Sequence, residues 1–142
     1  MPGAIELVAR LNSQGVMVGV ATNQSGVARG YFDEDAVRGF HDLMQEQLRP
    51  HGAHIDRFEY CPHHPSQGSP PYLTLCNCRK PEAGMLLTLA DLFGIEPRDA
   101  VVIGDRTSDL EAAKRAGMAS MQFAGGDLLE AVLRAGWLDG VT

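Results

Sequence analysis

Two short runs of apolar residues, 16–21 and 100–103, have no polar residue at alternate positions. Strands of this kind are covered on both faces, as in a parallel sheet that lies between helices. Two further strands are predicted at 55–60 and 119–123. Apolar residues recur at helical spacing in the segments between them, which are 4–11, 36–48, 83–93, 108–116 and 128–133. Strands that alternate with helices of this length predict parallel βαβ units and a doubly wound α/β sheet.

The predicted helix after Asp33 has clear signals at both ends. Asp33 is a residue type that caps helices, and Gly52 is a typical stop. The apolar stripe of this helix consists of Ala36, Val37, Phe40, Leu43, Met44 and Leu48.

Size and charge narrow the class of protein. The 142 residues predict a single domain, 1–142, with enough apolar residues for a core. A net charge of -6 argues against a nucleic-acid partner. No run approaches the roughly 18 apolar residues of a membrane span, and no signal peptide is recognisable. We therefore expect a cytoplasmic monomer that contacts neither nucleic acid nor membrane.

All three cysteines of the chain lie in one long loop, 61–81, rich in proline, serine and glycine. An odd number of cysteines gathered in one segment favours a metal site over a disulfide framework. Three thiolates and one imidazole form a closed set that structural Zn²⁺ prefers. Spacing alone does not separate His63 from His64, and unligated buried cysteines are the alternative. The predicted zinc ligands are Cys61, His63, Cys76 and Cys78.

Two segments carry groups that suit a phosphate. The turn 22–26, Thr-Asn-Gln-Ser-Gly, follows the first predicted strand and offers hydroxyl, amide and backbone N–H donors. Arg79 and Lys80 stand just before a predicted helix and would add a planar fork and a compact positive charge. In open parallel sheets ligands bind at the carboxyl ends of the strands, where the turn lies. Taken alone, the turn also suits an ordinary polar connection.

A pair of carboxylates follows the strand 100–103. Asp105 and Asp109 are four residues apart, between the end of that strand and the start of a helix. Carboxylate oxygens in such a place suit Mg²⁺. The alternative is that Asp109 is a first-turn acid favoured by the helix dipole, with Asp105 an ordinary loop residue.

Together these motifs resemble the haloacid dehalogenase (HAD) superfamily of phosphatases, and within it the branch that hydrolyses a heptose bisphosphate. The matching stretches are 22–26, 28–32, 61–64, 76–81, 84–85 and 104–105, in order along the chain. The zinc loop joined to Arg-Lys-Pro is the most specific of them. The histidinol-phosphatase branch also carries a zinc loop and is the alternative enzyme. The longer loop and the Gly84-Met85 pair favour the heptose branch.

The resemblance implies a role for each candidate residue. The catalytic set would be Thr22, Asn23 and Lys80, which bind the transferring phosphoryl group and neutralise its charge. Asp105 would bind catalytic Mg²⁺, while the zinc would be structural and shape a loop beside a capless site. The small phosphosugar would also contact Gln24, Ser25, Arg79 and Arg106. Arg106 departs from the family pattern, in which lysine is usual.

The family's reaction also implies an Asp-x-Asp pair at the end of a first, central strand. The sequence Asp33-Glu34-Asp35 has this spacing but follows no apolar strand, so we interpret it as a helix cap with first-turn acids. We therefore expect an N-terminally truncated domain that lacks its first central strand, leaves two strands unpaired across the interruption, and is inactive alone. A non-catalytic phosphosugar-binding domain and a zinc-dependent interaction domain are the alternatives.

Overall fold

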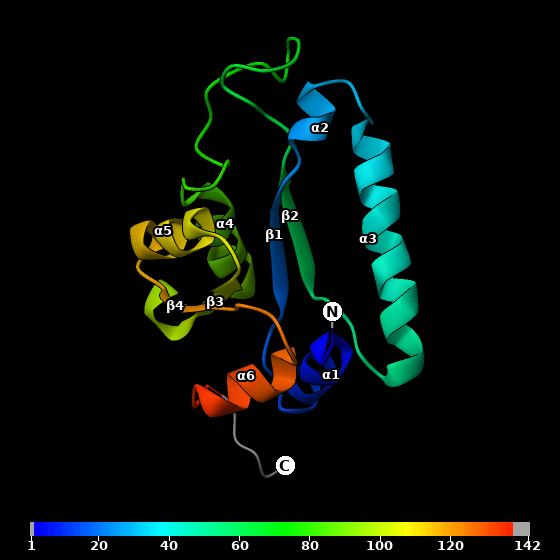
Figure 1. Cartoon of the computed structure of the whole chain (residues 1–142), viewed down its shortest axis with the longest axis vertical. Helices are drawn as coiled ribbons and strands as arrows, with labels where there is room; N and C mark the ends of the chain where they lie inside the picture. Colours follow the sequence, from blue (N-terminus) through cyan, green and yellow to red (C-terminus); the bar gives the residue numbers. More distant parts are fainter. Residues whose placement is uncertain (1, 138–142) are drawn as a thin grey trace.

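The computed structural model describes residues 2–137 of the chain (Figure 1). The strands are β1 (Gly19–Asn23), β2 (Arg57–Cys61), β3 (Val101–Gly104) and β4 (Ala119–Gln122). The α-helices are α1 (Ala4–Ser13), α2 (Ser25–Ala28), α3 (Glu34–Leu48), α4 (Gly84–Phe93), α5 (Thr107–Ala116) and α6 (Leu128–Arg134). Two 3₁₀ turns, η1 (Arg49–His51) and η2 (Pro97–Asp99), precede β2 and β3.

The strands form two separate parallel pairs. β1 pairs with β2, with Gly19 opposite Arg57, and β3 pairs with β4, with Val101 opposite Ala119. Within residues 2–137 no ladder joins β1 to β3. The parallel βαβ prediction is confirmed, and so is the expected interruption between these two strands.

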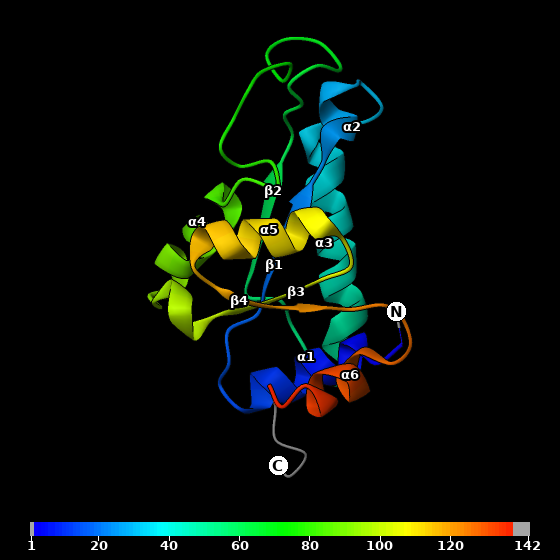
Figure 2. The ribbon, with the colours of Figure 1, turned by 60° about the vertical axis from the view of Figure 1, so that its left-hand side comes forward.

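One layer of helices covers both strand pairs. Helices α4 and α5 contribute a buried cluster of Leu86, Ala112, Ala113 and Ala116. Ala21 of β1 and Val102 of β3 both pack against this cluster, so the two pairs share one apolar layer without sharing hydrogen bonds. In Figure 2, α5 lies across β3 and β4.

A second packing region lies between α1, α6 and β4. Leu7 of α1 and Val132 of α6 are buried against each other, and Met121 of β4 joins them. A third cluster, built on Leu48 and Ile55, receives residues of α1, β1 and β2. Both views place α1 and α6 side by side at one end of the molecule, with α2 and the long loop at the other. The carboxyl end of β1 therefore lies away from the α1–α6 packing, beside α2 and the long loop.

Three predictions about the strands and the turn after β1 are wrong in detail. β1 begins at Gly19, three residues later than predicted, and the turn after it winds into the short helix α2. The prediction that β3 is covered on both faces is also wrong, since Val101 and Ile103 are 38% and 36% exposed. These exposed side chains alternate with half-buried ones because only the α5 side of this strand is packed. No helix among the described residues is long and apolar enough to cross a membrane.

Helix α3 begins as predicted but buries a different stripe. The Asp33 carboxylate accepts a hydrogen bond from the Ala36 amide at 2.9 Å, which confirms the cap. Val37 and Leu48 are buried as predicted, whereas Phe40, Leu43 and Met44 are exposed. The place of these three is taken by His41, whose ring stacks on Phe58 of β2 at 4.2 Å between centroids. A polar residue on the buried face is not visible in a pattern of apolar residues.

His41 should make stability depend on pH. Burial lowers the pKa of this imidazole below its ordinary 6.5, so the unfolded chain binds the proton more readily than the folded one. The stabilisation is then complete above about pH 6.5 and is lost as the pH falls below that value. Urea midpoints at pH 7.5 and 5.5 should show this loss in the wild type and a smaller one in His41→Phe.

The exposed His51 supplies the matched control. The variant His51→Gln removes another histidine of the same segment and should keep the wild-type pH dependence. An unchanged pH dependence in His41→Phe would show that His41 is not the group responsible.

Candidate functional site

A polar cavity of about 280 Å³ lies at the carboxyl ends of β1 and β3. Polar ligand sites of open parallel sheets lie at this edge, so its position agrees with the expectation from sequence. Its lining comes from the end of β1, the loop before α4, and the turn from β3 into α5. The lining residues are Thr22, Asn23, Lys80, Asp105, Arg106, Ser108 and Asp109.

Lys80 is held in this cavity from both sides of the interrupted sheet. The Asn23 side chain accepts a hydrogen bond from the Lys80 amide at 2.9 Å and donates one to its carbonyl at 3.3 Å. The Lys80 ammonium donates to the Ala21 carbonyl of β1 at 3.1 Å and forms an ion pair with the Asp109 carboxylate of α5. Asn23 therefore fixes the backbone of Lys80, and Asp109 fixes the direction of its charge.

Asp109 is buried and both of its oxygens are engaged. One oxygen faces the Lys80 ammonium, and the other accepts a hydrogen bond from the Arg106 amide at 3.2 Å, which closes the first turn of α5. This close approach requires Gly104, because a Cβ there would lie 2.4 Å from the Asp109 Cβ. The reading of Asp109 as a first-turn helix acid is thus correct, and the ion pair with Lys80 adds to it.

Asp105 occupies a different environment from Asp109. It is exposed, lines the cavity, and has no ion pair within residues 2–137. Of the two carboxylates that the sequence singled out, Asp105 is the one whose oxygens are open to a cation. Arg106 beside it is also exposed and lines the same cavity.

The remaining predicted contacts lie outside this cavity. The Gln24 amide donates to the Thr22 hydroxyl at 3.4 Å, and Ser25 begins α2, but neither residue lines the cavity. Arg79 lines a second cavity of about 220 Å³ on the side of the cysteine loop. One of its guanidinium nitrogens is buried with no hydrogen-bond partner among the described residues. The structure thus brings Thr22, Asn23 and Lys80 together with Asp105, and places Arg79 beside them.

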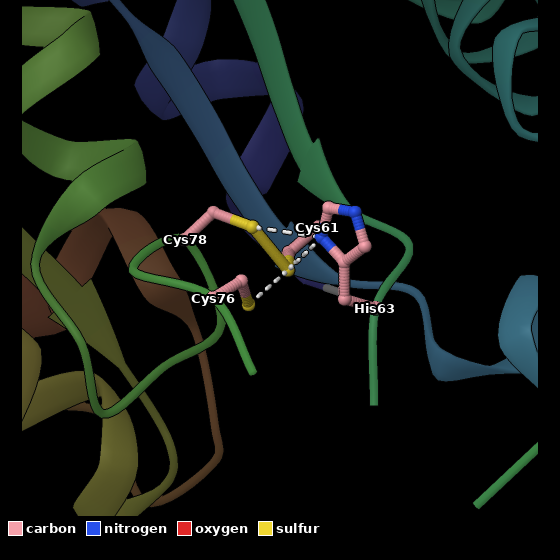
Figure 3. Close-up of side chains that lie close together, drawn as sticks. All are labelled: Cys61, His63, Cys76 and Cys78. Atoms are coloured by element: carbon pink, nitrogen blue, oxygen red, sulfur yellow. Dashed lines mark hydrogen bonds between the residues drawn. A yellow bond between two sulfur atoms is a disulfide. The ribbon is translucent and has the colours of Figure 1, made fainter. Parts of the chain in front are cut away.

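The cysteine loop brings its four predicted ligands together (Figure 3). The ligand atoms of Cys61, His63, Cys76 and Cys78 all lie within 4.8 Å of one another. The His63 Nδ1 is 3.6 Å from the Cys61 sulfur and 3.4 Å from the Cys78 sulfur, and the Cys61 and Cys76 sulfurs are 3.5 Å apart. The structure joins Cys61 to Cys78 by a disulfide and leaves Cys76 free. With that disulfide reduced, these atoms form a set that could hold a metal ion.

His64 is turned away from this cluster. Its Nδ1 accepts hydrogen bonds from the Ser66 and Gln67 amides at 3.1 and 3.0 Å. Desolvation, with Arg79 and Arg29 nearby, lowers the pKa of His64, so the ring is held as a neutral acceptor. The geometry therefore supplies what spacing could not, namely that His63 is the histidine of the cluster.

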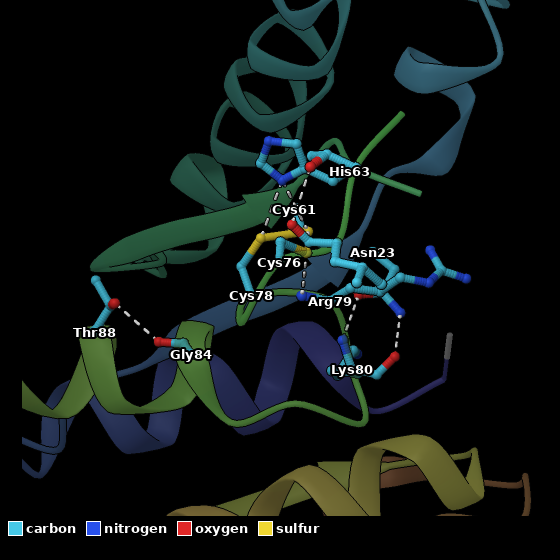
Figure 4. The surroundings of a disulfide bond; sticks show 11 residues. Asn23, Cys61, His63, Cys76, Cys78, Arg79, Lys80, Gly84 and Thr88 are labelled. Carbon is cyan, nitrogen blue, oxygen red and sulfur yellow. Dashed lines mark hydrogen bonds between the residues drawn. A yellow bond between two sulfur atoms is a disulfide. The ribbon is translucent and has the colours of Figure 1, made fainter. Parts of the chain in front are cut away.

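A short segment links the cysteine cluster to Lys80 (Figure 4). The Cys76 sulfur accepts a hydrogen bond from the Arg79 amide at 3.4 Å, one residue before Lys80. The Gly84 amide donates to the Asn77 carbonyl at 2.8 Å. A Cβ on Gly84 would lie 2.2 Å from the Asn77 carbonyl oxygen, so only glycine allows this contact. The cluster and the cavity are thus joined through a few tightly packed residues.

Sequence reasoning missed two features of this region. Ser108 lines the cavity, although it reads as an ordinary residue of a helix start. Glu34 binds the hydroxyls of Tyr60 and Tyr72, although it reads as a first-turn acid. Neither has a sequence signal, because each contact depends on how distant segments pack.

Removing one partner of the ion pair between Lys80 and Asp109 should strongly destabilise the fold. Both side chains are largely buried, at 15% and 10% exposure, so Asp109→Asn leaves a nearly buried ammonium without its counter-ion. We expect a loss of about 3 kcal/mol, the lower end for breaking a buried pair. Urea unfolding at pH 7 measures it, and the exposed Asp105→Asn, at the same turn, should change stability by less than about 0.5 kcal/mol. Equal losses in the two variants would contradict the assignment.

Comparison with known proteins finds relatives among the HAD-like phosphatases. The family model described as HAD-hydrolase-like matches residues 77–136. D-glycero-β-D-manno-heptose-1,7-bisphosphate 7-phosphatase of Rhodopseudomonas palustris is 44% identical over 128 residues, covering 90% of this chain and 71% of that protein. The protein of the same name from Pseudomonas aeruginosa is 40% identical over 114 residues, covering 80% of this chain but only 60% of its own length.

Solved structures similar to this chain include heptose bisphosphate phosphatases as well. D,D-heptose 1,7-bisphosphate phosphatase from B. bronchiseptica, complexed with magnesium and phosphate, superposes with a TM-score of 0.78 at 34% identity, covering 99% of this chain and 74% of that one. The enzyme of that name from Burkholderia thailandensis gives 0.63 at 32% identity, covering 97% of this chain and 74% of its own. The chain belongs to the HAD-like family of heptose-1,7-bisphosphate 7-phosphatases.

Proposed function

We propose that this chain is the main part of a phosphatase that removes the 7-phosphate of D-glycero-D-manno-heptose 1,7-bisphosphate and leaves the 1-phosphate. One observation carries the proposal: Thr22, Asn23 and Lys80 meet Asp105 around a single polar cavity at the carboxyl ends of β1 and β3. The relative from Rhodopseudomonas palustris is named as a 7-phosphatase of this bisphosphate, and the B. bronchiseptica structure is named as a D,D-heptose 1,7-bisphosphate phosphatase.

The residues of the cavity have distinct tasks in this proposal. The Thr22 hydroxyl and backbone amides at the end of β1 hold the phosphoryl oxygens, and Asn23 keeps the Lys80 backbone in place. Lys80 directs a positive charge into the cavity, where it neutralises charge that develops on the phosphoryl group. Asp109 keeps that charge oriented, so it acts on the substrate only through Lys80.

Asp105 is the proposed magnesium ligand of the described residues. Its exposed carboxylate faces the cavity, and oxygen ligands of this kind are those that Mg²⁺ takes in phosphoryl-transfer sites. When bound, the ion would supply positive charge to the phosphoryl oxygens. The B. bronchiseptica structure that this chain resembles holds magnesium and phosphate, which supports the assignment. Arg79 and Arg106 are proposed to contact the sugar or its second phosphate.

The cysteine cluster is proposed to hold a structural zinc ion. Its donors, three sulfurs and one imidazole nitrogen, are the set that closed zinc sites use. Tetrahedral ligands about 2.0–2.3 Å from the ion lie roughly 3.3–3.8 Å from one another. The three separations of 3.4, 3.5 and 3.6 Å between His63 or Cys76 and their neighbours agree with that spacing. Bound zinc requires Cys61 and Cys78 as thiolates, so the protein must be reduced.

The catalytic unit is proposed to include one more parallel strand between β1 and β3. Support comes from the interrupted sheet, in which no ladder joins β1 to β3 within residues 2–137 while the helices α4 and α5 pack against both strands. The resemblance implies that such a strand ends in Asp-x-Asp beside the cavity, where the first Asp attacks phosphorus and the second transfers protons. Residues 2–137 place no such pair at that edge.

Residues 1–142 alone should therefore release no phosphate from heptose 1,7-bisphosphate above background, because binding without a nucleophile gives no measurable turnover. A fused N-terminal strand that ends in Asp-x-Asp should bring Mg²⁺-dependent phosphate release. It should also raise the urea midpoint, since burying a central strand contributes several kcal/mol at about 25 cal/mol per Å². Phosphate release is measured colorimetrically.

The matched control carries Asn for the first Asp of the added strand. This control should have the same urea midpoint as the version with Asp-x-Asp and should release no phosphate above background. Turnover by residues 1–142 alone that depends on Asp105 would reveal a nucleophile within this chain. Equal urea midpoints with and without the strand would instead contradict its place between β1 and β3.

We expect one zinc ion per chain in protein purified under reducing conditions. His63→Gln should lower the zinc content well below one, because within residues 2–137 it removes the only imidazole whose nitrogen reaches the sulfurs. The neighbouring His64→Gln is the matched control and should keep full zinc, since its ring binds the loop backbone instead. Elemental analysis of dialysed protein gives the ratio. Full zinc in His63→Gln together with loss in His64→Gln would reverse the assignment.

A further inference from the structure

Glu34 lies at the crossing of three segments that are far apart in the sequence. Its carboxylate accepts a hydrogen bond from the Tyr60 hydroxyl of β2 at 2.7 Å and another from the Tyr72 hydroxyl of the cysteine loop at 2.5 Å. Arg38, one turn later on α3, donates to the same Tyr60 hydroxyl at 3.1 Å. Both carboxylate oxygens of Glu34 are therefore used to join α3 to β2 and to the loop.

The capping role at this helix start belongs to another residue. Asp33 accepts the hydrogen bond from the Ala36 amide, and Asp35 pairs with Arg38 while 84% exposed. Glu34 alone of these three acids turns toward the loop and is half-buried. The hydrogen bonds from Tyr72 and Tyr60 hold the pKa of Glu34 below its ordinary value, so the side chain is a carboxylate at neutral pH.

The loop segment around Tyr72, which Glu34 holds, is hydrogen-bonded to His64, the residue after the predicted ligand His63. The Tyr72 carbonyl accepts a hydrogen bond from the His64 amide at 3.0 Å, and the Thr74 amide donates to the His64 carbonyl at 3.0 Å. The Tyr72 ring also lies 6.3 Å from the His63 ring. A displacement of Tyr72 would thus be passed through two backbone hydrogen bonds to the residue next to His63.

The other contact of Glu34, with the Tyr60 hydroxyl, connects it to the cluster through β2. Tyr60 directly precedes Cys61, the only fully buried ligand sulfur, at the end of β2. The Glu34 carboxylate therefore binds both segments that lead into the cluster. One is the end of β2, which carries Cys61, and the other is the loop segment around Tyr72 that continues to Cys76. No other described acid side chain contacts both.

We propose that Glu34 is a positioning residue of the cysteine cluster, which clamps Tyr60 and Tyr72 so that the loop presents His63 and Cys61 in the geometry a metal ion requires. The proposal rests on the metal centre proposed above. Groups hydrogen-bonded to metal ligands typically change metal affinity by 10–100-fold when removed. Glu34 acts on residues next to the ligands, so its removal should fall at the lower end of that range. The clamp therefore has a measurable expected effect that is separate from catalysis.

The test compares Glu34→Gln with Asp35→Asn. Each variant removes one negative charge from the first turn of α3, but only the first loses the carboxylate that serves both tyrosines. We expect zinc to leave Glu34→Gln about 10-fold faster than it leaves the wild type, followed with a chromogenic chelator. Asp35→Asn should release zinc at the wild-type rate. The visible absorption of Co²⁺-loaded protein, which reports ligand geometry, should change in Glu34→Gln alone.

A double variant shows whether the effect passes through Tyr72. Glu34→Gln and Tyr72→Phe should each speed zinc release, and the variant with both changes should be no faster than the faster single one. Additive effects would overturn the clamp, as would equal release rates in Glu34→Gln and Asp35→Asn.

A protease assay on reduced, metal-free protein separates the clamp from the metal proposal. Cleavage within 62–75 should be faster in Glu34→Gln than in Asp35→Asn, because the neutral amide replaces two charge-assisted hydrogen bonds with weaker ones. If the wild type binds no zinc, the metal centre is wrong, and this assay still decides whether Glu34 holds the loop. Equal cleavage in the two variants would overturn the clamp whatever the metal result.

Discussion

The ion pair between Lys80 and Asp109 crosses an interrupted sheet. β1 and β3 share no hydrogen-bonded ladder within the described part of the chain, so the strand pairs are joined mainly through the apolar layer of α4 and α5. Lys80 adds a polar connection at the other end of the strands, from the Ala21 carbonyl of β1 to Asp109 of α5. The same side chain therefore holds the two halves at the distance that the cavity requires, and it supplies the cavity's positive charge.

The cysteine loop extends this arrangement to the far side of the cavity. Its inner part contacts the Lys80 segment through the Cys76 sulfur and the Asn77 carbonyl. Its outer part is bound to α3 through Tyr72 and Glu34. The loop thus connects α3 on one side of the molecule to the polar cavity. These contacts explain why so long a segment without helix or strand keeps a defined course.

The alternating strands and helices of this fold were predictable because the sequence signals for them are local. The strand runs, the glycines after the helices and the Asp33 cap each lie within a few residues of the structure that they specify. The place of the candidate cavity was also predictable, since β1 and β3 are each followed by polar residues at their carboxyl ends, where parallel strands bind ligands. The choice between His63 and His64 was not, because it depends on where two loop amides point. The burial of His41 and the role of Glu34 likewise come from packing between α3, β2 and the loop.

The short path from Cys76 to Lys80 has a thermodynamic consequence. The Cys76 sulfur accepts a hydrogen bond from the Arg79 amide, and the next residue, Lys80, is held by Asn23. The Gly84 amide binds the Asn77 carbonyl of the same segment. If an ion in the cluster tightens the hold of Lys80 on a phosphate by some factor, then by reciprocity the phosphate must tighten the hold of the cluster on the ion by the same factor. The two sites are then one cooperative unit, in which substrate protects the metal against loss as much as the metal prepares the site for substrate.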